Sequence, residues 1–526
     1  MLFQTSSFLV FFIVFYMFYL ATRNSLRLQN LCIMLFSYIF YAAWNLKLLS
    51  LIIIATAVAF VVGLAANGSK IDRKQLLQMA SLISLGCSVA LVPSIASSLN
   101  LYLTCLSTIP LLILFSIVVN PLSPERRAYL AVITGIFLNL SLLGFFKYYH
   151  FFVSSILDGA AIVGYQVDYV VPNILLPVGI SFFTFQKLAY IIDVKRGLVT
   201  PERNLIRFSA FVAFFPQLVA GPIERANSLL SQFYQKRVVR RDNLTTGSLL
   251  FLWGMFEKTF VADNLASLSA LSFNEPGRQN SGVLMVGLLA FAFQILCDFS
   301  GYSNMARGLA RVLGIELMVN FNVPYISRSP SDFWARWHIS LSSWLRDYLY
   351  IPLGGNRGSS IITYRNLFLT MLLGGLWHGA SWTFVAWGAF HGSILIIYRL
   401  MRVDQLLNHE YKSRATKLSI DLFFAFTMFG LTLFGWLLFR AKSMYQVLLY
   451  IEGILSVDKI TYGQWDHLWI YITPIILASV MQVKFRDTEF IRHLHPIFKL
   501  NVILLLACSI LFASPDVNVP FIYFDF

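Results

Sequence analysis

The chain has 526 residues, of which 58% are apolar and 12% are charged, and its formal net charge is +15. Soluble globular proteins carry about 25% charged residues because their surfaces face water, so this composition excludes a soluble enzyme and predicts an all-α polytopic membrane protein. The positive charge has two possible causes: cytoplasmic loops, where multispan proteins accumulate Lys and Arg, or attraction of an anionic substrate. No basic domain indicates binding to nucleic acid.

Apolar segments that could cross a bilayer recur along the whole chain. The first has neither a basic start nor a clear cleavage site, so we expect an uncleaved span rather than a secretory signal. A spanning helix needs about 20 mainly apolar residues. Several segments are short, charged or interrupted by Pro, and we expect about 11–14 transmembrane and re-entrant helices. The segments cover residues 7–21, 29–45, 47–66, 76–97, 99–119, 128–148, 173–192, 206–223, 246–268, 282–304, 366–399, 418–439, 443–456, 467–483 and 497–513.

Polar and aromatic residues become frequent between about residues 296 and 392, within an otherwise membrane-like background. Ionisable groups at membrane depth are costly and usually line a cavity or a reaction path. Asp298 and Tyr302 lie one helical turn apart in an apolar segment. The carboxylate needs a partner, for which Arg307, Arg311 or a His is available. We expect Asp298 to support the reacting groups rather than to react itself.

The stretch 329–350 predicts one amphipathic helix. Ser329 or Ser331 serves as the N-cap, and Asp332 stands in the first turn. Apolar side chains recur at spacings of three and four, which is typical of one buried face. His338 lies on or beside that face, either as a hydrogen-bonded packing residue or as a functional imidazole. The apolar positions are Trp334, Trp337, Leu341, Trp344, Leu345 and Tyr348, and the opposite side carries Arg336, Ser340, Ser343 and Asp347.

A glycine-rich stretch, 352–358, follows and contains Asn356 and Arg357. Backbone of this kind with an Arg holds a phosphate in some proteins, but it more often forms a tight loop at the end of a helix. It lacks the Lys-Ser/Thr pair of a P-loop.

His378 stands in an apolar segment and is flanked by three glycines. The glycines permit close approach of a neighbouring helix or of a substrate. Desolvation disfavours the imidazolium cation, so His378 should keep the neutral imidazole that a general base near pH 7 requires. Interhelical hydrogen bonding is the alternative role. For His391, thirteen residues further on, packing is the favoured role.

Eight short motifs stand in order along the chain. They are Leu176–Phe182, Phe215–Pro222, Asp298–Tyr302, Asn320–Tyr325, Phe333–Leu341, Trp344–Ile351, Leu353–Gly358 and Leu376–Gly379. Together they resemble the bacterial branch of the membrane-bound O-acyltransferase family, most closely its alginate O-acetylases.

The resemblance implies a bundle of transmembrane and re-entrant helices around a tunnel. We expect N-terminal helices in residues 1–139, the catalytic core in 140–395 and C-terminal helices in 396–526. His378 matches the family's near-universal histidine and His338 matches its second polar position, so both are expected to be catalytic. The residues expected to bind substrate or to support the two histidines are Asp298, Tyr302, Trp337, Arg336, Arg346, Asn356, Arg357 and Trp377.

The same resemblance implies an O-acyltransferase in the inner membrane of a bacterium. It would move an acyl group, expected to be acetyl from cytoplasmic acetyl-CoA, for O-acetylation of an exported acidic polysaccharide such as alginate. The expected partners are the lipid bilayer and a separate exported acetyltransferase with a serine nucleophile, and neither a bound cofactor nor a metal is expected. The alternative is a transporter or flippase of a cell-envelope intermediate. That alternative predicts inverted repeats and paired broken helices, and we detect no such repeat.

Overall fold

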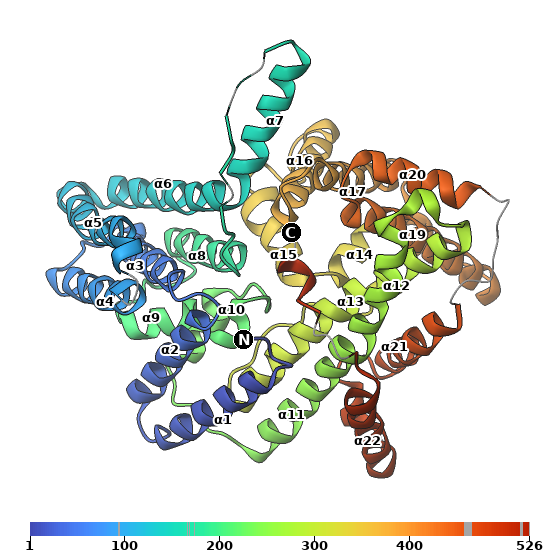
Figure 1. Cartoon of the computed structure of the whole chain (residues 1–526), viewed down its shortest axis with the longest axis horizontal. Helices are drawn as coiled ribbons and strands as arrows, with labels where there is room; N and C mark the ends of the chain where they lie inside the picture. Colours follow the sequence, from blue (N-terminus) through green and yellow to red (C-terminus); the bar gives the residue numbers. More distant parts are fainter. Residues whose placement is uncertain are drawn as a thin grey trace. The chain divides into compact units, whose positions relative to one another are not determined.

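The structure is a computed structural model that describes residues 1–92, 95–165, 167, 169–172, 174–456, 465–515 and 519–524. Helices dominate this part of the chain, and it contains no β-strand (Figure 1). Contacts divide the chain into two compact units, which we call unit one (1–244 and 310–317) and unit two (245–309 and 318–526). The three-part division expected from the sequence stays a prediction.

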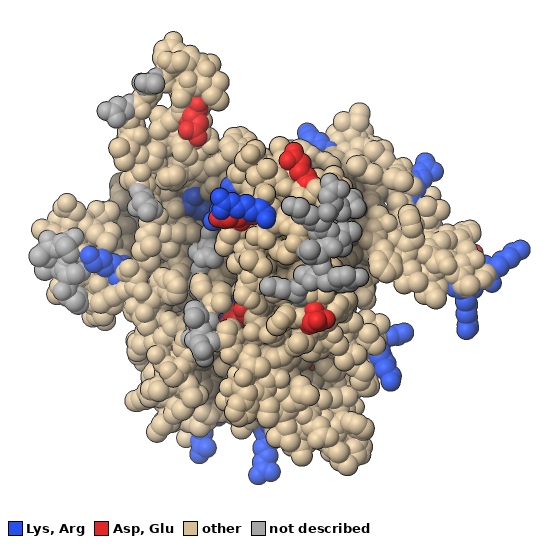
Figure 2. Space-filling view, turned by 45° about the vertical axis from the view of Figure 1, so that its right-hand side comes forward, with Lys and Arg blue, Asp and Glu red and all other residues tan. Residues whose placement is uncertain are grey.

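The described helices are those of an all-α, multi-pass membrane protein. Nine of them are long and apolar enough to cross a membrane, and three shorter apolar helices accompany them within the described residues. Nine candidate spans are fewer than the expected 11–14 helices, a number that included re-entrant helices, so the exact number of spans stays a prediction. Uncharged residues cover most of the face drawn in Figure 2. The nine long candidates are Leu49–Ala66, Arg73–Leu91, Ser98–Val119, Pro124–Ile162, Ser281–Val312, Trp382–Leu400, Arg414–Arg440, Trp465–Phe485 and Pro496–Ala513.

In unit one, helix α3 is the most buried span and packs against α4, α6 and α8. The approach of α8 requires a glycine, because a Cβ on Gly63 would lie 2.4 Å from the Tyr190 ring. The helices of this unit are α1 (Ser6–Ala21), α2 (Leu26–Ala42), α3 (Leu49–Ala66), α4 (Arg73–Leu91), α5 (Ile95–Val119), α6 (Pro124–Leu143), η2 (Gly144–Tyr148), α7 (Tyr149–Ile162), α8 (Ile180–Lys195), α9 (Leu205–Val212), α10 (Phe215–Leu218) and η3 (Ala226–Leu230).

Unit two is built on α13, which is buried along most of its length. The helix formed by α11 and η4 crosses it closely, because a Cβ on Gly301 would lie 2.7 Å from the carbonyl oxygen of Gly254. The helices of this unit, of which α11 begins and α13 ends within the ranges of unit one, are α11 (Arg241–Met255), η4 (Phe256–Ala262), α12 (Asp263–Asn274), η5 (Pro276–Arg278), α13 (Ser281–Val312), η6 (Pro324–Ile326), α14 (Pro330–Arg336), α15 (Ile339–Leu345), η7 (Arg346–Tyr350), α16 (Ser360–His378), α17 (Trp382–Leu400), α18 (Val403–Asn408), α19 (Arg414–Arg440), α20 (Met444–Leu455), α21 (Trp465–Phe485), η9 (Phe490–His493), α22 (Pro496–Ala513) and η10 (Ile522–Phe524).

Two of the expected spans are wrong. The segment 206–223 forms only the short helices α9 and α10, because Pro216 has no N–H to continue the hydrogen bonding of α9. The segment 366–399 is a hairpin of α16 and α17 rather than one span. A Cβ on Gly375 would lie 2.3 Å from the carbonyl oxygen of Phe384, so glycine allows the two helices to pack backbone to backbone.

Parts of two further expected spans cannot be compared. Residues 93–94 of the segment 76–97 and residue 173 of the segment 173–192 lie outside the described residues. The helix within 173–192 begins only at Ile180, after Gly179 in the left-handed conformation.

Candidate active site

His338 interrupts the helix expected over residues 329–350. Helix α14 begins as predicted, with Ser329 as its N-cap and Pro330 in its first turn, but it ends at Arg336. His338 then takes the left-handed conformation with φ 42°, and α15 starts after it. The single amphipathic helix was therefore a wrong prediction, and Ser340, expected on the polar side, is fully buried.

Asn320 stabilises this break from the neighbouring loop. Its backbone carbonyl accepts a hydrogen bond from the Ile339 amide at 3.0 Å, and its side-chain oxygen accepts one from the Ser340 amide at 3.2 Å. The first amide groups of a helix have no partner within the helix. Asn320 therefore caps the first turn of α15, so the His338 side chain is not needed as the N-cap.

The His338 imidazole is fully buried. Its Nδ1 lies 3.4 Å from the Ser340 hydroxyl, and its Nε2 has no hydrogen-bond partner among the described residues. The residue lies outside the candidate spans. Burial lowers the pKa of His338 to about 3, because desolvation disfavours the cation, so the imidazole is neutral at physiological pH.

His378 is the last residue of α16 and is also buried. Its ring centroid lies 4.9 Å from that of Trp387 and 5.3 Å from that of Phe439. The next residue must be small, because a Cβ on Gly379 would lie 2.0 Å from the Phe384 ring. The glycine thus lets α17 cover the histidine that ends α16.

One aromatic cluster brings the two predicted histidines together. The ring centroid of Trp377 lies 5.9 Å from that of His338 and 5.0 Å from that of His378. On another side, Phe299 lies 4.6 Å from His338 and 4.7 Å from Tyr523, whose ring is 5.7 Å from His378. Both imidazoles therefore lie in one buried cluster of aromatic rings, and Trp377, expected to bind substrate or to support the histidines, contacts both of them.

Asp298 and Tyr302 lie beside this cluster, but the expected partner of Asp298 was wrong. Asp298 pairs with Lys258 at 2.7 Å, and its other carboxylate oxygen accepts a hydrogen bond from the Ile522 amide at 2.7 Å. The Tyr302 ring packs on Phe521 at 5.1 Å. Both residues thus contact the C-terminal segment that carries Tyr523 against His378.

Lys258 completes a buried ionic cluster. Its Nζ lies 2.7 Å from Asp263 as well as from Asp298, and it donates a hydrogen bond to the Val519 carbonyl at 3.0 Å. The side chains of the three charged residues are at most 4% exposed. The cluster therefore ties the segment 519–524 to η4 and α13.

The remaining predicted site residues differ in their surroundings. Trp337 is buried, with its ring 4.7 Å from that of Trp436. Arg336 is partly exposed and pairs with Asp332 at 2.6 Å. Three others are exposed and so are not brought together with the buried imidazoles, namely Arg346, Asn356 and Arg357.

The stretch 352–358 forms a tight loop, one of the two expected alternatives. Gly354, Gly355 and Gly358 all adopt positive φ angles, which glycine takes without steric cost. Asn356 accepts hydrogen bonds from the Tyr350 hydroxyl at 2.5 Å and from Arg399 at 3.1 Å. Its capacity to hold a phosphate stays a prediction.

Several residues of the site were missed from the sequence. Lys258 lies in an apolar segment without a recognisable motif, and Tyr523 follows the last span. The signals were present: an isolated Lys in an apolar run needs a counter-ion, and the aromatic run 521–524 is unusual in a polar tail. His391, expected to be a packing residue, lies 4.6 Å from the Trp387 ring.

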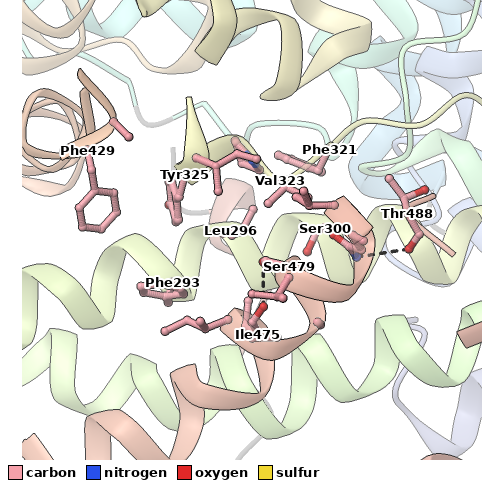
Figure 3. A pocket seen from close by; sticks show the side chains of 18 of the residues that line it. Phe293, Leu296, Ser300, Phe321, Val323, Tyr325, Phe429, Ile475, Ser479 and Thr488 are labelled. Carbon is pink, nitrogen blue, oxygen red and sulfur yellow. Dashed lines mark hydrogen bonds between the residues drawn. The ribbon is translucent and has the colours of Figure 1, made fainter. Parts of the chain in front are cut away.

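A cavity of about 820 Å³ adjoins the site within unit two. Asn320 and Phe321 form part of its wall, and Figure 3 shows Phe321. The Phe321 ring lies 5.1 Å from Phe299 and 4.9 Å from Trp337. The cavity wall therefore shares residues with the support of His338.

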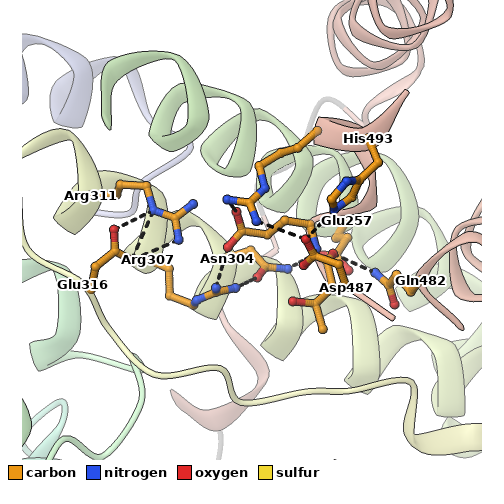
Figure 4. A network of polar contacts seen from close by, with 11 residues as sticks. Glu257, Asn304, Arg307, Arg311, Glu316, Gln482, Asp487 and His493 are labelled. Atoms are coloured by element: carbon orange, nitrogen blue, oxygen red, sulfur yellow. Dashed lines mark hydrogen bonds and ion pairs between the residues drawn. The ribbon is translucent and has the colours of Figure 1, made fainter. Parts of the chain in front are cut away.

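A polar network borders the same cavity. Glu257 accepts hydrogen bonds at 2.8 Å from both Ser300 and Asn304. Asn304 accepts one from Arg307, which pairs with Glu489 at 2.7 Å (Figure 4). The chain of alternating donors and acceptors satisfies charged groups that would be costly if buried alone.

Comparisons with known proteins identify relatives of the chain. Residues 201–438 match the model of the membrane-bound O-acyltransferase family. The chain is 48% identical to a probable alginate O-acetylase of Azotobacter vinelandii, over 59% of this chain but only 60% of that relative. It is 34% identical to a probable alginate O-acetylase of Pseudomonas putida over the whole length of both. It is also 33% identical to a peptidoglycan O-acetyltransferase of Helicobacter pylori, over 65% of this chain and 68% of that relative.

The matched region contains both histidines, and the full-length relative extends the similarity to both ends of the chain. The chain therefore belongs to the membrane-bound O-acyltransferase family of enzymes.

Proposed function

We propose that the chain moves an acetyl group from cytoplasmic acetyl-CoA across the bacterial inner membrane, for O-acetylation of an exported polysaccharide such as alginate. The names of the full-length and partial relatives support the polysaccharide and the acetyl group. The donor and the acceptor are in different compartments, which accounts for a transferase with many spans. A tunnel that reaches the two histidines from both sides belongs to the same proposal.

The observation that carries the proposal is the pair of buried imidazoles in one cluster of aromatic rings. His378 acts as the general base and removes the proton of the acceptor hydroxyl, whose oxygen then attacks the thioester carbonyl carbon. When the tetrahedral intermediate collapses, the C–S bond breaks and the His378 imidazolium returns the proton to the leaving thiolate. A general base of this kind contributes on the order of 10²–10⁴-fold to the rate.

His338 polarises the thioester carbonyl in this scheme. In the tautomer with a proton on Nε2, the nitrogen without a described partner donates to the developing oxyanion. Its Nδ1 then accepts the hydrogen of the Ser340 hydroxyl, 3.4 Å away. Aromatic walls exclude water, which would otherwise hydrolyse the thioester.

A separate exported protein with a serine nucleophile takes the acetyl group onward to the polymer. The exposed Arg346 and Arg357, expected from the sequence to bind substrate or to support the histidines, are proposed as contacts for an anionic substrate. Arg336 has Asp332 as its neighbour, so its proposed role is to hold the turn before His338 in place.

Labelled acetyl-CoA tests the proposal. Inner-membrane vesicles from cells with and without the chain are supplied with [¹⁴C]acetyl-CoA, and label is followed into protein and polysaccharide. Chain-dependent, hydroxyl-linked acetate supports an acyltransferase. Chain-dependent accumulation of intact, untransferred label in the lumen would overturn the proposal in favour of a transporter.

A further inference from the structure

The cavity beside the active site is amphipathic along its length. Phe293, Tyr325 and Phe429 surround one end, where the Tyr325 ring lies 5.5 Å from Phe293 and 5.4 Å from Phe429. Ser300 and Thr488 lie toward the other end (Figure 3). The eight residues between Asp421 and Phe429 on α19 correspond to about 12 Å. The cavity wall therefore offers an apolar section as well as polar groups.

The walls of the cavity that come from α19 and α21 are exposed to the surroundings. Leu418 is 59% exposed, Phe426 75% and Val480 58%, and all three line the cavity. Both helices are long and apolar enough to cross a membrane, so these side chains face hydrocarbon. The cavity is thus accessible to a molecule that diffuses within the bilayer.

The cavity wall around Arg328 has a local excess of positive charge. Arg328 and Lys417 both pair with Asp421, at 2.8 and 3.1 Å. Their side chains are 39% and 32% exposed, and one carboxylate cannot neutralise two cations. The acidic wall residue Glu257 is engaged with Ser300 and Asn304 instead. Arg328 therefore has capacity left for an anion, and its planar guanidinium suits a phosphate.

We propose that this cavity binds a bilayer phospholipid, with an acyl chain along the apolar section and the phosphate at Arg328. An apolar section, a wall exposed to hydrocarbon and the cation Arg328 in that wall match the chemistry of such a lipid. The volume of about 820 Å³ falls within the range of about 300–1,000 Å³ that is typical of ligand sites.

The bound lipid would stabilise aromatic residues that pack beside the active site. Trp436 donates a hydrogen bond to the Tyr325 hydroxyl at 3.1 Å, and its ring packs on Trp337 at 4.7 Å, one residue before His338. Because Tyr325 lines the cavity, a chain packed against it restricts this set of rings. Loss of the lipid should lower the acyl-transfer rate without removing a reacting group.

Lipid retention tests the proposal independently of activity. The full-length protein is purified in detergent, delipidated, and titrated with phosphatidylglycerol, phosphatidylethanolamine or inorganic phosphate while adducts are counted by native mass spectrometry. Ala425→Phe fills the cavity from α19, and Thr427→Phe places the same side chain on the exposed face of the same helix, outside the cavity lining. Arg328→Gln removes the cation.

We expect one saturable phospholipid adduct on the wild type and on Thr427→Phe, no such adduct on Ala425→Phe, and about tenfold weaker binding by Arg328→Gln. Equal binding of the two phospholipids assigns recognition to the shared phosphate, and preference for phosphatidylglycerol assigns it to net negative charge. The proposal is overturned if no phospholipid saturates, if inorganic phosphate alone occupies the site, or if the two Phe variants retain lipid equally. Because this readout needs no acetyl-CoA, it separates failure of the lipid site from failure of the proposed reaction.

Discussion

Replacement of Lys258 by methionine tests how the C-terminal segment reaches His378. The Lys258 ammonium lies 2.7 Å from each of two carboxylates, Asp263 and Asp298, and its side chain is 1% exposed. Methionine keeps the length of the side chain but leaves both carboxylates buried without their cation. Breaking a buried ion pair in this way costs about 3–5 kcal/mol, so we expect a clear fall in the thermal unfolding midpoint of the detergent-purified protein.

The same variant should release the segment 519–524. It removes the hydrogen bond to the Val519 carbonyl, and it leaves the Asp298 carboxylate, which accepts a hydrogen bond from the Ile522 amide, without its cation. Hydrogen exchange at the Ile522 amide measures this directly. We expect protection in the wild type and fast exchange in Lys258→Met, together with a loss of acyl transfer, since Tyr523 would leave its place against His378.

An exposed ion pair provides the control for this experiment. Arg278 pairs with Glu275 at 2.9 Å, but the two side chains are 79% and 58% exposed, and such surface pairs contribute little to stability. Arg278→Met should therefore match the wild type, and the double variant Lys258→Met/Asp298→Asn should recover part of the loss. If Lys258→Met unfolds at the wild-type temperature and keeps the Ile522 amide protected, the reasoning about the ionic cluster is refuted.

Two further predictions concern stability. The pKa of His338 is lowered from 6.5 to about 3, so below pH 6.5 the unfolded state binds a proton that the folded state does not. Lowering the pH from 7.5 to 5 should therefore reduce the free energy of unfolding by about 2 kcal/mol. The free energy of unfolding of His338→Gln should fall less over the same pH range, because this variant has no imidazole at the position. A wild type and variant with the same pH dependence would show that the folded imidazole titrates normally. A Cβ on Gly388 would lie 2.5 Å from the Met371 carbonyl oxygen, so Gly388→Ala should separate α16 from α17 and cost about 1–3 kcal/mol. Gly430→Ala, with nothing within 4 Å, should be neutral in the same thermal unfolding assay, and equal destabilisation of the two variants would contradict the packing argument.

Much of the fold follows from local sequence, because long apolar runs specify spanning helices by themselves. The two histidines were singled out because polar groups within apolar segments are costly and because their motifs resemble a known family, and their catalytic role stays a prediction. The break at His338 was not predictable from periodicity. The spacing of Trp334, Leu341 and Leu345 continues through it, and the hydrogen bonds from Asn320 that favour the break come from a separate loop.

Contacts between distant segments account for the other errors. The pairing of Asp298 with Lys258 and the position of Tyr523 depend on how α13, η4 and the C-terminal segment meet. Arg307 was nearer to Asp298 in sequence, but it pairs with Glu489 instead. Sequence patterns identify which groups need partners, whereas tertiary packing decides which partner each group receives.

The most direct test of the account is the rate of acetyl transfer by His378→Ala in membrane vesicles, measured beside His391→Ala. Both histidines are buried, and both rings contact Trp387, at 4.9 and 4.6 Å. Both variants therefore lose similar packing, but only His378→Ala loses the proposed base. The account predicts that His378→Ala, present in the membrane at the wild-type level, loses on the order of 10²-fold or more in rate, while His391→Ala retains transfer. Transfer by His378→Ala at the wild-type rate would contradict the assignment of this imidazole as the base.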